Sequence, residues 1–254
     1  MGHYTDILPS GGDTGANLNL NRRFNFILQY VNLAGKMILD CGCGSGDYVL
    51  KFLAYSPKVY GIEHELKKVE VFRSRGIRPE SVQQGDIEHM NFGDETFDCV
   101  LLNEVLEHVP DDLQALKEIS RVLKPGGALI VFSPNRLYPF ETHAVTLKLA
   151  SLKIPYFVPF IPYIPLAIGK RVFTYHARNY FPWELRKMLS KTGFQIERQT
   201  ALWQTFENIS GQAPRVIRFL SPFLRKVSWT MEKVPILKLF GVSQAIIARK
   251  KAPV

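Results

Sequence analysis

The sequence predicts an α/β fold in which short buried strands alternate with helices. Two observations carry this prediction. Apolar runs of strand length, such as residues 37–39, alternate with stretches whose apolar residues recur every three or four positions. Turns rich in glycine or polar residues separate the two patterns. At 254 residues, of which 46% are hydrophobic, the chain is long enough for one large domain with a closed core.

The first strand ends at Asp40 and is followed by three glycines at alternate positions, Gly42, Gly44 and Gly46. Residues without a Cβ adopt positive φ readily and let a ligand lie against the main chain. The loop leads into a helix pattern, whose free N–H groups favour a negatively charged or electron-rich ligand. The spacing is neither the dinucleotide pattern G-x-G-x-x-G nor a phosphate loop. A glycine-rich turn without a ligand is the alternative.

Polar residues stand at the carboxyl ends of three further predicted strands. Glu63 follows the strand at 58–62, about twenty residues past the glycine loop, where an acidic residue can accept hydrogen bonds from ribose hydroxyls. Asp86 follows a short strand at 81–84, and Asn103 ends a strand over 97–102. Ligands in open parallel sheets bind outside these strand ends, so the three side chains are candidates for one site.

Four motifs in this order resemble those of class I S-adenosylmethionine-dependent methyltransferases. They are Asp-x-Gly-x-Gly-x-Gly at 40–46, the glutamate at 63, Asn-Glu-Val-Leu-Glu-His-Val-Pro at 103–110, and Leu-Lys-Pro-Gly-Gly at 123–127. The third is similar to small-molecule methyltransferases related to the ubiquinone and menaquinone biosynthetic enzymes. The resemblance implies a Rossmann-like, doubly wound, seven-stranded sheet, mostly parallel with an antiparallel last strand.

The resemblance also implies S-adenosylmethionine as cofactor, with S-adenosylhomocysteine as product. Asp40 would help hold the amino end, Glu63 the ribose, and Asp86 the adenine amino group, while Asn103 would lie beside the methionine portion. The full set of expected cofactor-binding residues is Asp40, Gly42, Cys43, Gly44, Gly46, Glu63, His64, Asp86, Ile87 and Asn103.

We expect a single methyltransferase domain over residues 1–254, made of four parts. These are an N-terminal arm and helix at 1–35, the cofactor-binding core at 36–135, an apolar lid insertion at 136–181, and the C-terminal part of the sheet at 182–254, with a basic amphipathic insertion at about 201–241.

The N-terminal helix is expected to follow a mobile arm over residues 1–21, because apolar residues repeat at helical spacing after it. In the resembling family a helix here often covers the cofactor cleft. Arg22 and Arg23 would then face the carboxylate of the cofactor, but a solvated pair of arginines is the expectation.

The predicted lid contains an apolar and aromatic run over 152–168 with prolines at 155, 159, 162 and 165. Prolines at this density exclude a continuous helix, and the run is shorter than a bilayer span. Insertions at this place form the acceptor lid in the resembling family, and an apolar lid suits an aromatic or lipid-like acceptor. A flap that packs on its own domain, or that makes a dimer contact, is the alternative.

A hydroxyl acceptor usually needs a positioned base, and His143 and His176 are the candidates because they bracket the lid. A structural role is the alternative for each histidine. Glu141 and Tyr138 are weaker candidates, and His108 is expected to fix its loop. A neutral amine or an activated carbon would need no base.

The net charge of +9 would favour anionic partners without choosing among them. No nucleic-acid module is recognised, and the Asn/Asp-Pro-Pro-Tyr/Phe motif of base-amine methylases is absent. A small-molecule acceptor is therefore favoured over an RNA or protein substrate, and over a non-catalytic cofactor-binding protein. Basic and aromatic residues interleave over 214–240, which predicts peripheral contact with an anionic membrane, or a helix that covers its own core.

Three cysteines, Cys41, Cys43 and Cys99, do not make a disulfide framework and indicate a reducing compartment. No second pair of ligands completes a metal site around Cys41 and Cys43, so no metal is expected. The N-terminal stretch lacks a signal-peptide pattern. We expect a cytoplasmic protein, peripheral to the inner face of the membrane if the basic segment binds lipid, and either a monomer or a homodimer.

Overall fold

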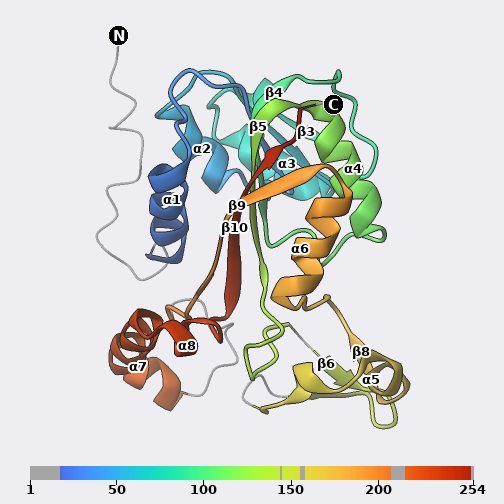
Figure 1. The fold of residues 1–254 in the computed structure, drawn as a ribbon, viewed down its shortest axis with the longest axis vertical. Coiled ribbons are helices and arrows are strands. Elements are labelled where there is room, and N and C mark those ends of the chain that lie inside the picture. Colours follow the sequence, from blue (N-terminus) through green and yellow to red (C-terminus); the bar gives the residue numbers. More distant parts are fainter. Residues whose placement is uncertain (1–17, 144, 155–157, 207–214, 253–254) are drawn as a thin grey trace.

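A computed structural model of the chain describes residues 18–143, 145–154, 158–206 and 215–252. Seven strands form one sheet in the order β3-β2-β1-β4-β5-β10-β9 (Figure 1). The strands are β1 (Ile38–Cys41), β2 (Val59–Glu63), β3 (Val82–Gln84), β4 (Phe97–Asn103), β5 (Leu123–Pro134), β9 (Phe194–Leu202) and β10 (Ser243–Lys250).

The first five strands of the sheet run parallel to one another, and β10 runs antiparallel between β5 and β9. The predicted sheet, mostly parallel with an antiparallel last strand, is confirmed. From β1 the chain first adds β2 and β3 on one side of the sheet, and it then crosses to the other side of β1 to add β4 and β5. The carboxyl ends of β1 and β4 therefore lie side by side at the point where the strand order reverses, which is where doubly wound sheets bind ligands.

Helices cover both faces of the sheet, because successive strand residues point to opposite faces. Ile38 packs with α1 (Leu18–Tyr30), α2 (Asp47–Leu53) and α3 (Leu66–Ser74). Leu39 packs on the other face with α4 (Asp112–Val122) and α6 (Pro182–Lys191). The central strands are apolar on both faces over most of their length, as expected for a parallel sheet buried on both sides.

Two element boundaries differ from the sequence prediction. The N-terminal helix already includes Leu18, so the predicted arm over 1–21 is too long by at least four residues, and the rest of it lies outside the described residues. The fifth strand begins at Leu123 and not at 128. Gly126 has φ +74°, and the register with β4 shifts between Phe97 and Cys99, so the Pro-Gly-Gly turn forms a bulge within the strand.

The predicted lid region folds as a small separate sheet. Its three antiparallel strands have the order β7-β6-β8, and two short helices accompany them. No helix runs continuously across the described part of the proline-rich run. The elements are β6 (Val145–Leu147), β7 (Leu152–Ile154), the 3₁₀ helix η4 (Ile161–Tyr163), α5 (Leu166–Val172) and β8 (Phe173–Tyr175).

The C-terminal insertion between β9 and β10 contains α7 (Arg215–Lys233) and the short α8 (Pro235–Lys238). Figure 1 shows α7 and α8 at the same end of the molecule as the small sheet, beyond the carboxyl end of β5. Both insertions therefore flank the end of the sheet where a ligand site is expected. Among the described residues, no helix is long and apolar enough to cross a membrane.

Candidate functional site

The glycine loop after β1 has the backbone that its sequence predicts. Gly42, Gly44 and Gly46 all have positive φ, at 67°, 57° and 85°. A Cβ on Gly42 would lie 2.4 Å from Val105 Cγ2, and one on Gly46 would lie 2.2 Å from Phe72 Cδ2. Gly44 differs, because nothing lies within 4 Å of where its Cβ would stand. Its main chain thus borders open space into which a ligand fits.

Glu63 is fixed at the end of β2 by two backbone amides. Its Oε2 accepts a hydrogen bond from Gly44 N–H at 2.8 Å, and its Oε1 accepts one from Glu65 N–H at 3.0 Å. The side chain is buried. A carboxylate held in this way has a fixed direction beside the glycine loop, and its remaining lone pairs can accept from vicinal hydroxyls.

Asp40 is buried at the end of β1, and its Oδ2 has no hydrogen-bond partner among the described residues. Burial raises its pKa well above the ordinary value, with further contributions from the charges of Glu63 and Asp47. A buried carboxyl oxygen without a partner is unfavourable. The residue therefore fits a ligand with a positively charged or hydrogen-donating group, such as an amino group.

The other expected cofactor residues lie at neighbouring strand ends. Asp86, after β3, accepts a hydrogen bond from Glu88 N–H at 2.9 Å, and Ile87 beside it is buried. His64 is exposed after β2, while Cys43 is buried within the glycine loop. Asn103 is half-buried at the end of β4. The structure thus brings the predicted set to one edge of the sheet.

Arg23 of α1 reaches this edge and is not solvated, so the expectation of a solvated arginine pair was wrong. Its Nη1 donates to Asn103 Oδ1 at 2.6 Å and its Nη2 to Glu104 Oε1 at 2.5 Å. Arg22 bonds in the other direction, to the Trp203 carbonyl at 2.8 Å and to Glu232 of α7. Arg23 stands four residues before Ile27, on the buried face of the helix, and this spacing was the available signal.

Two glutamates in the segment after β4, the half-buried Glu104 and the buried Glu107, form an acidic pair that the sequence analysis did not identify. Burial opposes ionisation of Glu104, but Arg23 and the Ser243 hydroxyl, which donates to it at 2.9 Å, hold its pKa below the ordinary value. Burial and the Glu104 charge raise the pKa of Glu107 well above the ordinary value. Glu104 therefore gives up its proton more readily than Glu107 does.

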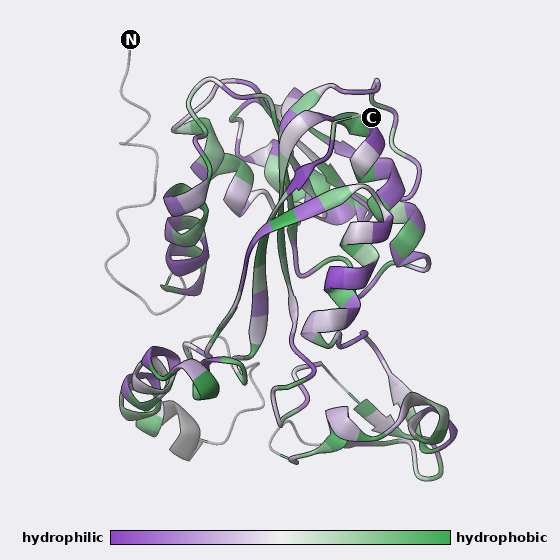
Figure 2. Ribbon diagram, viewed as in Figure 1, coloured by the Kyte–Doolittle hydropathy of each residue, from purple (hydrophilic) through white to green (hydrophobic). Residues whose placement is uncertain are grey.

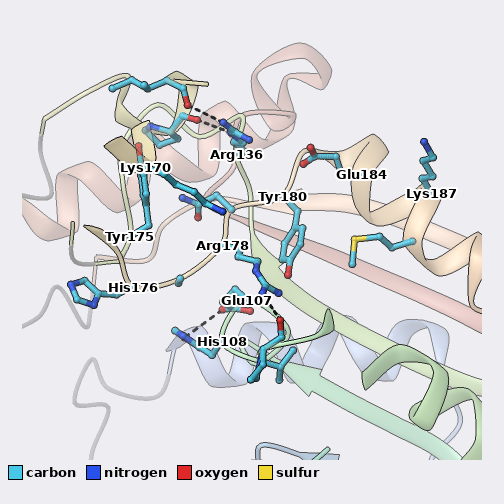
Figure 3. A pocket seen from close by; sticks show the side chains of 17 residues that line it. Glu107, His108, Arg136, Lys170, Tyr175, His176, Arg178, Tyr180, Glu184 and Lys187 are labelled. Carbon is cyan, nitrogen blue, oxygen red and sulfur yellow. Dashed lines mark hydrogen bonds and ion pairs between the residues drawn. The ribbon is translucent and has the colours of Figure 1, made fainter. Parts of the chain in front are cut away.

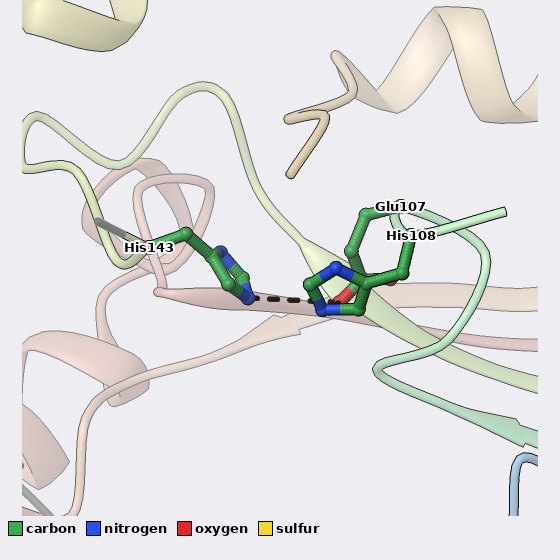
Figure 4. A group of neighbouring side chains, drawn as sticks. All are labelled: Glu107, His108 and His143. Atoms are coloured by element: carbon green, nitrogen blue, oxygen red, sulfur yellow. Dashed lines mark ion pairs between the residues drawn. The ribbon is translucent and has the colours of Figure 1, made fainter. Parts of the chain in front are cut away.

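Glu107, His108 and His143 form a cluster in which one carboxylate oxygen and one ring nitrogen of each histidine lie within 4.8 Å of one another (Figure 4). The Nε2 atoms of both histidines lie 4.0 Å from Glu107 Oε1. Burial lowers the pKa of His143, so its ring is neutral at pH 7 and can accept a proton. Such donors could also hold a divalent cation, and the absence of a metal stays a prediction.

Glu141 holds the loop that carries His143. The Glu141 carboxylate accepts from Asn179 Nδ2 at 2.9 Å, from Thr142 N–H at 3.0 Å and from His143 N–H at 3.2 Å. These hydrogen bonds show that Glu141 orients the loop. Burial raises the pKa of Tyr138 to about 12, which disfavours the phenolate form that a base would require.

A cavity of about 630 Å³ lies between the small sheet and α6 (Figure 3). His176 lines it and is exposed, with Nε2 3.3 Å from Thr146 Oγ1, so the structure does not bring His176 into the Glu107 cluster. Glu107 and His108 line the same cavity from the β4 side. Its wall also includes Val109, Ile164, Tyr175, Tyr180 and Met188.

Arg136 ties the small sheet to the main domain and was not identified from the sequence. Its Nε donates to the Pro162 carbonyl at 2.7 Å, and its Nη2 donates to the Ile164 carbonyl at 3.0 Å. The guanidinium lies 4.8 Å from the ring centroid of Phe181, at the start of α6. One buried cation thereby sets the position of the cavity roof over the core.

Comparisons with known proteins agree with this geometry. The family model described as "Methyltransferase domain" matches residues 39–131. A ubiquinone biosynthesis O-methyltransferase of Aliivibrio fischeri is 30% identical over 187 residues, which are 71% of this chain and 73% of that protein. A demethylmenaquinone methyltransferase of Staphylococcus aureus is 30% identical over 169 residues, covering 63% of this chain and 68% of that protein.

Solved structures share the fold. An S-adenosylmethionine-dependent methyltransferase from Mesorhizobium loti superposes with a TM-score of 0.58 at 16% identity, over 89% of this chain and 95% of that chain. The [4+2]-cyclase SpnF superposes with a TM-score of 0.57 at 21% identity, over 92% of this chain and 82% of that chain. Since a cyclase has this fold, the fold alone does not define the reaction.

The fold and the strand-end site define an α/β enzyme that binds a nucleoside cofactor. The chain belongs to the class I S-adenosylmethionine-dependent methyltransferases. Its cofactor is S-adenosylmethionine, and the unpartnered Asp40 oxygen, the open space at Gly44 and the fixed Glu63 carboxylate fit that molecule.

Proposed function

We propose that the protein methylates a hydroxyl group of an aromatic, apolar acceptor, which is small or linked to a lipid. The observation that carries this proposal is the neutral His143 in a cluster with Glu107 and His108, two residues that line the cavity. The curated relatives named above, which act in ubiquinone biosynthesis and on demethylmenaquinone, support an acceptor related to a quinone precursor.

For the cofactor we propose the following contacts. Asp40 accepts from the amino group, Glu63 accepts from the ribose hydroxyls, and Asp86 and the Ile87 amide meet the adenine. Asn103, held by Arg23, lies beside the methionine portion. S-adenosylmethionine supplies a methyl group on a positively charged sulfur, and these residues orient it for an in-line displacement.

His143 accepts the proton of the acceptor hydroxyl as the oxygen becomes nucleophilic. A neutral imidazole with a pKa below its ordinary value is already in the form that this step requires. Glu141 orients the loop, and a raised pKa favours the uncharged form of Glu107, which does not oppose an approaching hydroxyl oxygen. His176, which lines the cavity, remains a second candidate.

The cavity supports an acceptor with an apolar body. Aliphatic and aromatic side chains such as Val109, Ile164, Tyr175 and Met188 line it together with charged ones, so an apolar body can be bound and directed by polar groups. We propose that residues 136–181 are the acceptor lid, with the small sheet as the roof of the cavity. We propose that the enzyme acts in the cytoplasm as a monomer or homodimer, and that it reaches lipid-linked acceptors at the inner face of a membrane.

The proposal is tested by incubating the protein with methyl-labelled cofactor and fractionated cell extract, then sorting the label into organic-soluble, RNA and protein pools. We expect label in the organic-soluble pool, and roughly a hundredfold less when His143→Gln replaces the natural protein. Label in the RNA or protein pool would instead show that the acceptor is RNA or protein. Cofactor binding without label in any pool would indicate a non-catalytic binding protein.

A further inference from the structure

The most apolar face of α7 points away from the rest of the protein. Phe219, Leu220, Phe223 and Val227 recur at spacings of three and four and so share one side of the helix. Phe219 is 84% exposed and Phe223 is 65% exposed, and the other two are also exposed. We call these four residues the outward apolar face. If this face covered the core of its own protein, these four side chains would be buried.

The side of α7 that contacts the protein carries polar anchors beside the half-buried Leu224 and Met231. Ser228 stands nine positions after Phe219, which is half a turn round a helix of about 3.6 residues per turn, and it is only 3% exposed. Glu232 on the same side bonds to Arg22 of α1 and accepts from Trp203 N–H at 3.2 Å. Arg225 donates to the Thr205 carbonyl at 3.0 Å. The hydrogen bonds that anchor the helix thus lie away from the outward apolar face.

The charge beside the outward apolar face is positive. Lys226 and Lys233 are both exposed, and their seven-residue spacing places them on one flank of that face. The only acid of α7, Glu232, is turned toward Arg22 and does not neutralise them. The adjoining α8 region adds exposed apolar side chains at Ile236 and Leu239. Figure 2 shows both hydrophobic and hydrophilic residues along α7 and α8.

We propose that α7 and α8 dock on the surface of an anionic lipid bilayer, with Phe219 and Phe223 in the headgroup region and the two lysines against lipid phosphates. A helix with an apolar face flanked by lysines binds an anionic membrane in this orientation. A protein partner or a second copy would cover the apolar face as well, but the uncompensated lysines beside it favour a surface of uniform negative charge.

Docking in this orientation sets the acceptor end of the enzyme on the bilayer. The small sheet that roofs the cavity lies at the same end of the molecule as α7 (Figure 1). The bond between Glu232 and Arg22 connects the docked helix to α1, whose next residue, Arg23, holds Asn103. This inference rests on the proposed membrane setting, and it does not depend on which acceptor is methylated.

The test is co-sedimentation of the full chain with vesicles of phosphatidylcholine alone or with added phosphatidylglycerol. We expect binding that requires the anionic lipid and weakens as salt is raised. Phe219→Asp/Phe223→Asp should reduce binding at least tenfold, and Lys226→Gln/Lys233→Gln roughly fivefold per lysine removed, from the loss of about 1 kcal/mol each. The matched controls are Val71→Asp, at an exposed apolar residue of α3, and Lys117→Gln on α4.

The rate of methyl transfer to a short, water-soluble phenol is also measured for the same variants, without vesicles. This separates a failure of the docking proposal from a failure of the proposed function. We expect the α7 variants to keep the rate of the natural protein. Natural protein that stays in the supernatant, or a double phenylalanine variant that binds vesicles fully, would refute the docking proposal. So would a sedimentation-velocity result in which the outward apolar face proves to be the contact of a stable dimer.

Discussion

Arg23 and Glu104 are 81 positions apart in the chain, and their side chains meet at 2.5 Å in the wall of the cofactor edge. Arg23 also holds Asn103 and lies 5.1 Å from the ring centroid of Phe132. This buried arginine lowers the pKa of Glu104, while burial and the Glu104 charge raise that of Glu107. The N-terminal helix α1 is thereby joined to the segment that carries the proposed catalytic cluster.

Replacing Arg23 by alanine should destabilise the protein. Glu104, whose side chain is 28% exposed, would lose its buried cation, and hydrogen bonds to a charged group are worth about 1.5–3 kcal/mol. Urea denaturation measures the loss. Arg75→Ala is the control, because Arg75 pairs with Asp47 on the surface and its removal should cost about 0–1 kcal/mol. Equal losses in the two variants would contradict the role given to the buried pair.

Glu63→Ala should weaken cofactor binding far more than His143→Ala. Glu63 is fixed toward the glycine loop, and the loss of hydrogen bonds to a charged group, worth about 1.5–3 kcal/mol, corresponds to a factor of roughly ten to a hundred. His143 lies on the acceptor side and should change the dissociation constant less than about twofold. Calorimetry with S-adenosylhomocysteine measures both values. Comparable losses would show that the ribose lies elsewhere.

Gly44→Ala should remove cofactor binding while the fold survives. Its methyl group would enter the open space beside the main chain, and the positive φ would cost about 1–2 kcal/mol. Gly35→Ala is the matched control, since Gly35 also has positive φ and open space but lies before β1. Thermal melting should show similar losses for both variants, and calorimetry should show binding only for the control. Tight binding by Gly44→Ala would place the ligand away from this loop.

The activity of the enzyme should persist below the ordinary titration range of histidine. Burial lowers the pKa of His143, so the ring stays neutral, and able to accept a proton, below pH 6.5. As the pH falls through that lowered pKa, the ring takes a proton and kcat declines. A pH profile of kcat measures this limb, and His143→Gln should lower kcat and abolish the limb. An unchanged profile in His143→Gln would exclude His143 as the base.

Arg136→Met should loosen the roof of the cavity. The variant loses the bonds to the Pro162 and Ile164 carbonyls, so the acceptor KM should rise about tenfold while the cofactor dissociation constant stays the same. Steady-state kinetics and limited proteolysis of the small sheet give the two readouts. Lys148→Met is the control, because Lys148, directly after β6, bonds to the Lys170 carbonyl of α5 within the same region and not to the main domain. An equal effect of both variants would mean that the roof is not held at Arg136.

The core of the fold could be predicted because its signals are local. The strand from Ile38, the glycines after it and Glu63 at the next strand end each follow from a few consecutive residues and the order of the motifs. The antiparallel direction of the last strand came only from family resemblance, and the strand order was not predicted. The pairing of β6 with β8 joins three-residue strands that are far apart in the chain, and no short pattern predicts it.

The site was predictable where residues follow a strand end and unpredictable where they meet across the fold. Asn103 was expected at the cofactor edge, whereas its partner Arg23 comes from a helix that precedes the sheet. The sequence of α7 also showed an apolar face without showing its direction. Only the packing of Ser228 and Glu232 against the protein reveals that this face points outward.

The position of β10 between β5 and β9 has a consequence for synthesis of the chain. While the polypeptide is still emerging from the ribosome, β5 presents a free edge and β9 has no neighbour to join, because the strand that links them is translated after both. Completion of the sheet must therefore wait for residue 250 to clear the exit tunnel. Until then an apolar edge is open to wrong pairing, and chaperones that bind nascent chains should have their longest contact with this protein at that stage.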